Sequence, residues 1–138
     1  MKISADKIET IKNDILGIEY SLSVAYVVES KSREINKKYR NIDKATNVLS
    51  FALRKNEGEL VLCPGVIKRE AKNFGKTLEE FTVFLVIHGM LHLKGLEHSS
   101  TMERAEKKYD TKYNSRNRLG LLNDKSRRGR ILKRRKKS

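Results

Sequence analysis

Apolar residues recur along this chain at two spacings, and these predict its helices and strands. A helical repeat predicts helices over residues 5–16, 30–40, 64–74 and 101–113, and a further helix that Thr77 opens. Alternating apolar residues, many of them β-branched, predict strands over 21–29, 48–53 and 59–63. Strands mixed with helices predict a single domain of the α/β (α+β) class, with one mixed sheet packed by helices.

The helix that follows Thr77 is the most apolar part of the chain. Thr77 and Glu80 have the spacing of a capping box, in which each side chain bonds the backbone of the other. The apolar run 81–93 is interrupted by two histidines and is too short to cross a bilayer. We therefore expect this helix to lie buried in the core.

All three histidines of the chain fall within residues 88–98. His88 and His92 are four residues apart, so a helix presents both on one face. Gly95 suits the left-handed position after a helix end, and a turn there would bring His98 back over that face. Three imidazoles make a tridentate site for one Zn²⁺ per chain, with a position left open for water as in catalytic zinc sites.

Two readings compete for these histidines. Buried structural histidines are the commoner case for a single residue, but an unpaired buried ring costs about 1–3 kcal/mol. The spacing His-x-x-x-His-x-x-Gly-x-x-His matches the ligands of metzincin peptidases, with Gly89 where those enzymes carry their glutamate base. The motif therefore favours metal-assisted hydrolysis without the usual peptidase base. Glu97 is a candidate substitute base, or else a solvated carboxylate.

Positive charge is concentrated at the end of the chain. The 138 residues contain 31 Lys and Arg against 17 Asp and Glu, for a net charge of +14. Nine basic and no acidic residues lie in 125–138, which leaves about +5 for the rest. We expect a folded domain over 1–116 and a disordered basic tail over 117–138. A polyanion is the natural partner, and the tail either anchors the chain on RNA or only keeps it soluble.

Other features bear on the compartment. Cys63 is the one cysteine, so an intramolecular disulfide is excluded. The first residues lack the apolar run of a signal peptide. We expect a cytoplasmic protein with no membrane partner.

Three stretches together resemble the YbeY family. The segment 88–98 is similar to the signature His-Gly-x-Leu-His-Leu-x-Gly-Tyr-Asp-His, with Leu96 and Glu97 in place of Tyr and Asp. The segment 39–51 resembles Tyr-Arg-x-x-Asp-x-Pro-Thr-Asp/Asn-Val-Leu-Ser-Phe, with Ala45 in place of the proline. The segment 58–62 resembles Gly-Asp-Ile-Val-Ile, with Glu59 in place of the aspartate. The resemblance covers roughly residues 34–110.

The resemblance implies a zinc-dependent, single-strand-specific endoribonuclease that acts in ribosomal RNA processing, ribosome maturation and quality control. It implies four strands in the mixed sheet, and single-stranded or ribosomal RNA and the ribosome or its proteins as partners. His88, His92 and His98 would hold the metal, and Arg40 would lie beside it. A guanidinium there can clamp a phosphodiester in two places. Ser50, on the strand flanking the cleft, is a candidate substrate contact.

Several alternatives stay open at this point. Either a water on the metal or the 2′-hydroxyl of the RNA can be the nucleophile. One rival function is a non-catalytic zinc-containing RNA-binding or ribosome-assembly factor, in which Cys63 completes a structural site. The other is a metallopeptidase, against which Gly89 weighs.

Overall fold

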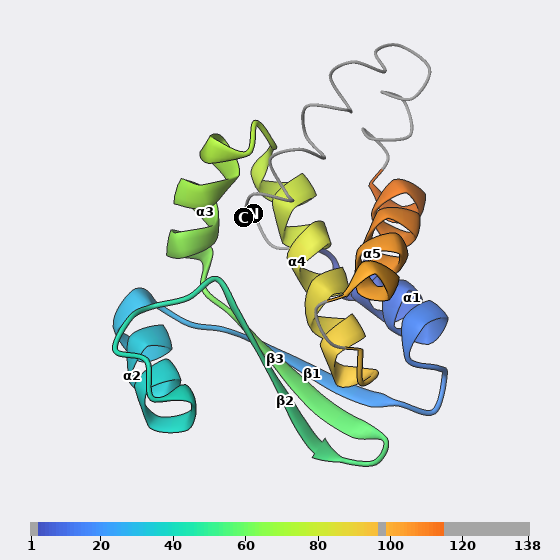
Figure 1. Cartoon of the computed structure of the whole chain (residues 1–138), viewed down its shortest axis with the longest axis horizontal. Coiled ribbons are helices and arrows are strands. Elements are labelled where there is room, and N and C mark those ends of the chain that lie inside the picture. The colour runs from blue at the N-terminus through green and yellow to red at the C-terminus, as the bar shows by residue number, and fades with distance from the viewer. Residues whose placement is uncertain (1–2, 97–98, 115–138) are drawn as a thin grey trace.

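The computed structural model describes residues 3–96 and 99–114, which form five helices and three strands (Figure 1). The tail predicted over 117–138 lies outside the described residues. The predicted helices and strands are confirmed, although the first strand ends at Tyr26 because a helix begins at Glu29. In chain order the elements are α1 Ala5–Ile15, β1 Ser21–Tyr26, α2 Glu29–Arg40, β2 Val48–Arg54, β3 Glu57–Leu62, α3 Pro64–Asn73, α4 Leu78–Leu93 and α5 Ser100–Tyr113.

The sheet is mixed, and β3 lies at its centre. Its order is β1-β3-β2, with β1 parallel and β2 antiparallel to β3. The expectation of four strands is wrong for the described residues, in which the sheet has three. The chain there holds only three runs of strand-like residues, and Ser4 already caps α1 by accepting a hydrogen bond from the Lys7 N–H. Because β2 is an edge strand, one side of its backbone faces away from the sheet.

Helix α4 runs through the middle of the core, as its apolar sequence predicts. Ten of its residues are buried, among them Val83, Val86, Ile87 and Met90 at 0% exposure. Figure 1 shows α1, α4 and α5 on one side of the sheet and α2 on the other. None of the helices that the structure describes is both long and apolar enough to cross a membrane.

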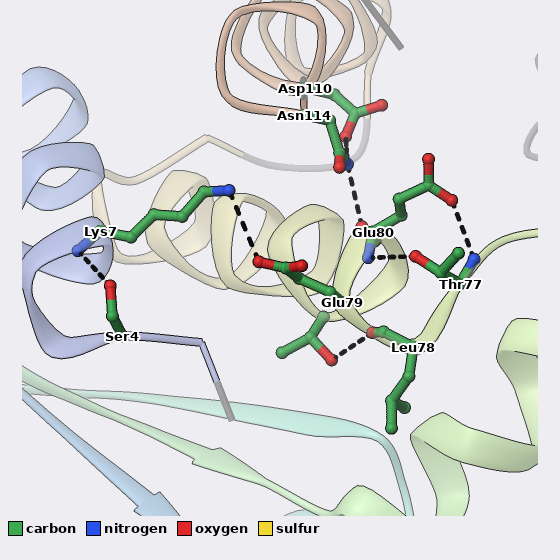
Figure 2. A network of polar contacts seen from close by, with 9 residues as sticks. Ser4, Lys7, Thr77, Leu78, Glu79, Glu80, Asp110 and Asn114 are labelled. Atoms are coloured by element: carbon green, nitrogen blue, oxygen red, sulfur yellow. Dashed lines mark hydrogen bonds and ion pairs between the residues drawn. The ribbon is translucent and has the colours of Figure 1, made fainter. Parts of the chain in front are cut away.

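The first turn of α4 is capped by its own side chains and tied to the end of α5. Thr77 Oγ1 accepts from the Glu80 N–H at 3.1 Å, and Glu80 Oε1 accepts from the Thr77 N–H at 2.8 Å, which confirms the capping box (Figure 2). Asn114 is buried, and its Nδ2 donates to the Glu80 carbonyl at 3.0 Å and to Asp110 Oδ1 at 2.9 Å. The two helices that carry the candidate site are therefore joined at this end.

A second link joins α5 to α1. Lys112 Nζ lies 2.7 Å from Asp14 Oδ2, and the Tyr113 hydroxyl donates to the same oxygen at 2.5 Å. The hydrogen bond from Lys112, followed by that from Tyr113, lowers the pKa of the Asp14 carboxyl. The pKa of Asp14 is lower in the folded than in the unfolded protein. The ionised carboxylate therefore stabilises the fold at pH values above the unfolded pKa.

The substitution Asp14→Asn should lower the free energy of unfolding by at most about 1 kcal/mol at pH 7, because the pair is partly exposed. The difference from the wild type should disappear as the pH falls below about 3.9 and through the lowered folded pKa of Asp14. Urea unfolding at pH 7 and at pH 3 measures both values. Glu34→Gln, which removes a carboxylate paired with Lys31 inside α2, is the control. A difference as large at pH 3 as at pH 7 would contradict the assignment to the carboxylate.

Candidate functional site

His88 and His92 lie one turn apart on α4, and their rings converge. Their Nε2 atoms are 3.1 Å apart, with ring centroids 4.6 Å apart and ring planes at 81°. Two nitrogens that each bind a tetrahedral zinc at about 2.0–2.1 Å lie about 3.3 Å apart. The spacing of this pair therefore fits two ligands of one metal ion.

Glu106 of α5 lies behind His88 and hydrogen-bonds it, a contact that was not predicted from the sequence. His88 Nδ1 hydrogen-bonds Glu106 Oε2, with the ring N–H as donor and the carboxylate oxygen as acceptor. This contact fixes the tautomer of His88 and leaves its Nε2 lone pair directed at His92. The Glu106 side chain is 15% exposed and that of His88 23%. A carboxylate behind a histidine is the usual outer support of a metal-binding imidazole.

A sequence signal for Glu106 does exist. Met102, Ala105 and Tyr109 pack against the core and define the inner face of α5. Glu106 follows Met102 by four residues, so the carboxylate lies on this apolar face. Glu106 and the buried Asp110 one turn later are carboxylates on this apolar face, which indicates specific partners, but the pattern does not say which ones.

The third predicted ligand, His98, and the candidate base Glu97 lie outside the described residues. The turn before them has the predicted form, because Gly95 has φ +103°. Over residues 3–96 and 99–114, no group of three or more His, Cys, Asp or Glu side chains is arranged to hold a metal. Only two of the three proposed ligands fall in that part of the chain.

The histidines open onto a cleft of about 1000 Å³ between β2, α3, α4 and α5. Phe74, Phe81 and Phe84 stack in succession along one wall, with centroids 5.2 and 6.2 Å apart, and Phe84 lies one turn before His88. The wall is therefore apolar close to the metal-binding candidates. The polar and charged lining residues are Arg40, Thr46, Asn47, Ser50, Glu70, Asn73, Lys76, His88, His92, Glu103, Glu106 and Lys107.

Arg40 is the last residue of α2, and it reaches the cleft around the edge of the sheet. Asn41 ends the helix in the left-handed conformation, with φ 59°. Arg40 Nη2 donates to the outward-facing carbonyl of Ser50 at 2.9 Å, and its guanidinium lies 5.7 Å from the Phe51 ring centroid. Arg40 and both described histidines thus line one cleft, as the resemblance implies.

Ser50 lines the same cleft, but its hydroxyl has a partner within the protein. Ser50 Oγ donates to the Gly89 carbonyl of α4 at 3.2 Å. A Cβ on Gly89 would lie 2.7 Å from Leu60 Cδ2 and 3.0 Å from Ser50 Oγ. The sequence position at which metzincins carry their glutamate base therefore has no room for a side chain here. Close packing of the helix on the sheet accounts for this glycine.

Cys63 is separate from this arrangement. It is 1% exposed, precedes α3 as its N-cap, and is not among the described residues that line the cleft. A zinc thiolate at Cys63 thus has no support from the geometry of the cleft.

The fold and the cleft define a small α+β protein with paired histidines on a buried helix. The sequence profile of a family described as Endoribonuclease YbeY matches residues 2–116. The chain therefore belongs to the YbeY family, which confirms the resemblance seen in the sequence.

Individual relatives agree with this assignment. Endoribonuclease YbeY of Cupriavidus necator is 40% identical over 105 residues, covering 72% of this chain and 53% of that protein. The Staphylococcus carnosus protein of the same name is 36% identical over 114 residues, covering 74% and 71%. The solution structure of TM1509 from Thermotoga maritima matches with a TM-score of 0.62 at 32% identity, covering 83% of this chain and 81% of that one. The chain spans about half the length of relatives such as the Cupriavidus necator protein.

Gly89→Ala should lower the free energy of unfolding by about 1–2 kcal/mol, because the clash with buried Leu60 outweighs the gain in helix propensity. Leu60→Val removes part of the obstructing side chain. The double variant should therefore lose less unfolding free energy than the two single variants lose in sum. Urea unfolding of the four proteins measures this coupling, and strictly additive effects would contradict the close approach.

Proposed function

We propose that this protein is a zinc-dependent endoribonuclease that cleaves single-stranded RNA in the processing of ribosomal RNA, and so serves ribosome maturation and quality control in the cytoplasm. One observation carries the proposal: the paired histidines, the Glu106 carboxylate and Arg40 line one cleft. The relatives named Endoribonuclease YbeY support the reaction. The net charge of +14 supports an RNA substrate and ribosomal partners.

His88 and His92 would hold one zinc ion, with His98 as the proposed third ligand. Zinc supplies a Lewis acid that polarises a phosphoryl oxygen and acidifies a water ligand toward a pKa of about 7. Imidazole nitrogens suit this metal, and the 3.1 Å separation of the two Nε2 atoms fits its coordination shell. Glu106 holds His88 in the tautomer that presents Nε2.

Arg40 would bind the scissile phosphate. Its guanidinium is held at the rim of the cleft by the Ser50 carbonyl, so its position does not depend on the substrate. A planar guanidinium can engage two phosphate oxygens and offset the charge that develops during attack. The Ser50 carbonyl supports the Arg40 side chain, and the Ser50 hydroxyl is a candidate substrate contact. Glu97 is retained as a candidate base.

Two features of the wider chain belong to the same proposal. The catalytic domain extends over 1–116, and the basic segment 117–138 is a separate tail that adds electrostatic attraction to RNA. The rival functions have less support. Cys63 lies away from the cleft lining, so a structural site with a thiolate is not favoured, and Gly89 leaves no room for a peptidase base.

Arg40→Ala should reduce the rate of cleavage of a single-stranded RNA by about 10²-fold, because a donor that stabilises developing charge is lost. Arg40→Lys should recover only part of the rate, since lysine keeps the charge but not the planar fork. The rate is measured on an end-labelled oligonucleotide with the zinc-loaded full chain. The same assay on DNA, together with the product ends, identifies the nucleophile: attack by the 2′-hydroxyl requires inert DNA and a cyclic phosphate product.

Arg54→Ala is the matched control, because Arg54 carries the same charge on β2 and is 83% exposed outside the cleft lining. It should cleave at the wild-type rate. His92→Ala, purified in the same way, should be inactive, which excludes a contaminating ribonuclease. A zinc-loaded wild-type chain that cleaves no RNA would overturn the proposed activity. Full activity of Arg40→Ala would overturn only the role of this arginine.

A further inference from the structure

Two aromatic rings meet on the side of the sheet that faces away from the metal site. Tyr39 of α2 and Phe51 of β2 contact edge to face, with centroids 5.4 Å apart and planes at 69°. Tyr39 is 59% exposed, and Phe51 is partly buried. This edge-to-face contact leaves Tyr39 more exposed than buried.

Cations flank both rings. Lys38 Nζ lies 5.3 Å from the centroid of Tyr39, and the Arg40 guanidinium lies 5.7 Å from that of Phe51. Lys37, Lys38 and Arg40 all belong to the last turn of α2, where the helix dipole favours positive charge. Exposed aromatic rings between cations are the arrangement by which proteins bind single-stranded nucleic acid. The bases stack on the rings, and the cations contact the phosphates.

The two rings are connected to the cleft through the edge strand. Ser50 bonds Gly89 of α4, so the side chain of its neighbour Phe51 points to the opposite face of the sheet. There it contacts Tyr39 of α2. Arg40 contacts both sides of β2, because its guanidinium lies over the Phe51 ring on one side and also lines the cleft on the other. In the part of the chain that the structure describes, β2 is an edge strand, so a strand of RNA can pass over it without displacing another strand of this sheet.

We propose that Tyr39 and Phe51, with Lys38 and Arg40, form a stacking platform that binds a nucleobase of single-stranded RNA next to the scissile phosphate. The two rings and Lys38 lie outside the cleft lining, and they hold the base on one side of β2 while Arg40 holds the phosphate that enters the cleft on the other. This inference rests on the proposed RNA substrate. It adds a reason for preferring single strands, because a base inside a duplex cannot turn its face to Tyr39.

The test measures binding apart from cleavage. The full chain is titrated into a 2′-O-methyl RNA 12-mer that carries one 2-aminopurine, whose fluorescence falls when it stacks on an aromatic ring. A gel confirms that the strand stays intact. Tyr39→Ala should weaken binding roughly fivefold to hundredfold, the range that base–aromatic stacking supplies, and should abolish the fluorescence change. Tyr39→Phe should restore both.

Controls separate stacking from charge and from folding. Ile18→Ala removes an apolar side chain that is 78% exposed and belongs to neither the platform nor the cleft, and it should bind as the wild type does. Tyr39→Ala should leave the salt dependence of binding unchanged, whereas Lys38→Gln should reduce its slope by about one unit. On an abasic strand, wild type and Tyr39→Ala should bind equally.

Three results would overturn the platform. These are wild-type affinity of Tyr39→Ala, an equal loss on the abasic strand, or a wild-type chain that binds no RNA. The proposed activity fails separately, by absence of cleavage, so a chain that binds through Tyr39 without cutting would retain the platform and lose the enzyme. If Tyr39→Ala weakened binding of a ribosomal protein but not of RNA, the surface would be a protein interface, and the proposal would be wrong.

Discussion

The close approach of α4 to the sheet at Gly89 is the constraint on which the candidate site depends. Without a side chain at this position, the helix lies against Leu60 and accepts the hydroxyl of Ser50. Its neighbour His88 and, one turn later, His92 then face the cleft, while Arg40 bonds the outer side of Ser50. A wider separation of α4 from β2 would move the histidines away from the arginine. One packing contact thus places groups from α2 and α4 in a single cleft.

The second support of the site comes from α5. Glu106 sets the tautomer of His88, and it can do so because Asn114, which is also bonded to Asp110 of α5, holds the end of α5 against the first turn of α4. The ion pair of Asp14 with Lys112 joins the same helix to α1. The helix that carries the carboxylate behind His88 is thus held by contacts of residues that do not line the cleft.

Local patterns predicted the elements well, because capping and periodicity act within a few residues. The Thr77–Glu80 box, the glycine turn at Gly95 and all three described strands follow from such signals. The four-stranded sheet came from the resemblance and is wrong for the described residues, in which the alternating runs number three. Glu106 and the Tyr39–Phe51 contact were missed, since each joins segments that only the tertiary fold brings together. His98 and Glu97 lie outside the described residues, so their roles remain predictions from the sequence.

The most direct test of the account is the zinc affinity of the full chain, measured by competition with a chromophoric chelator. The wild type should bind one zinc ion per chain, and His92→Ala should lose stoichiometric binding because a ligand is removed. Glu106→Gln should fold normally and bind zinc about 10–100-fold more weakly, since its amide supports the imidazole less well than a carboxylate does. Full zinc retention by His92→Ala would contradict the central claim that this histidine pair holds the metal.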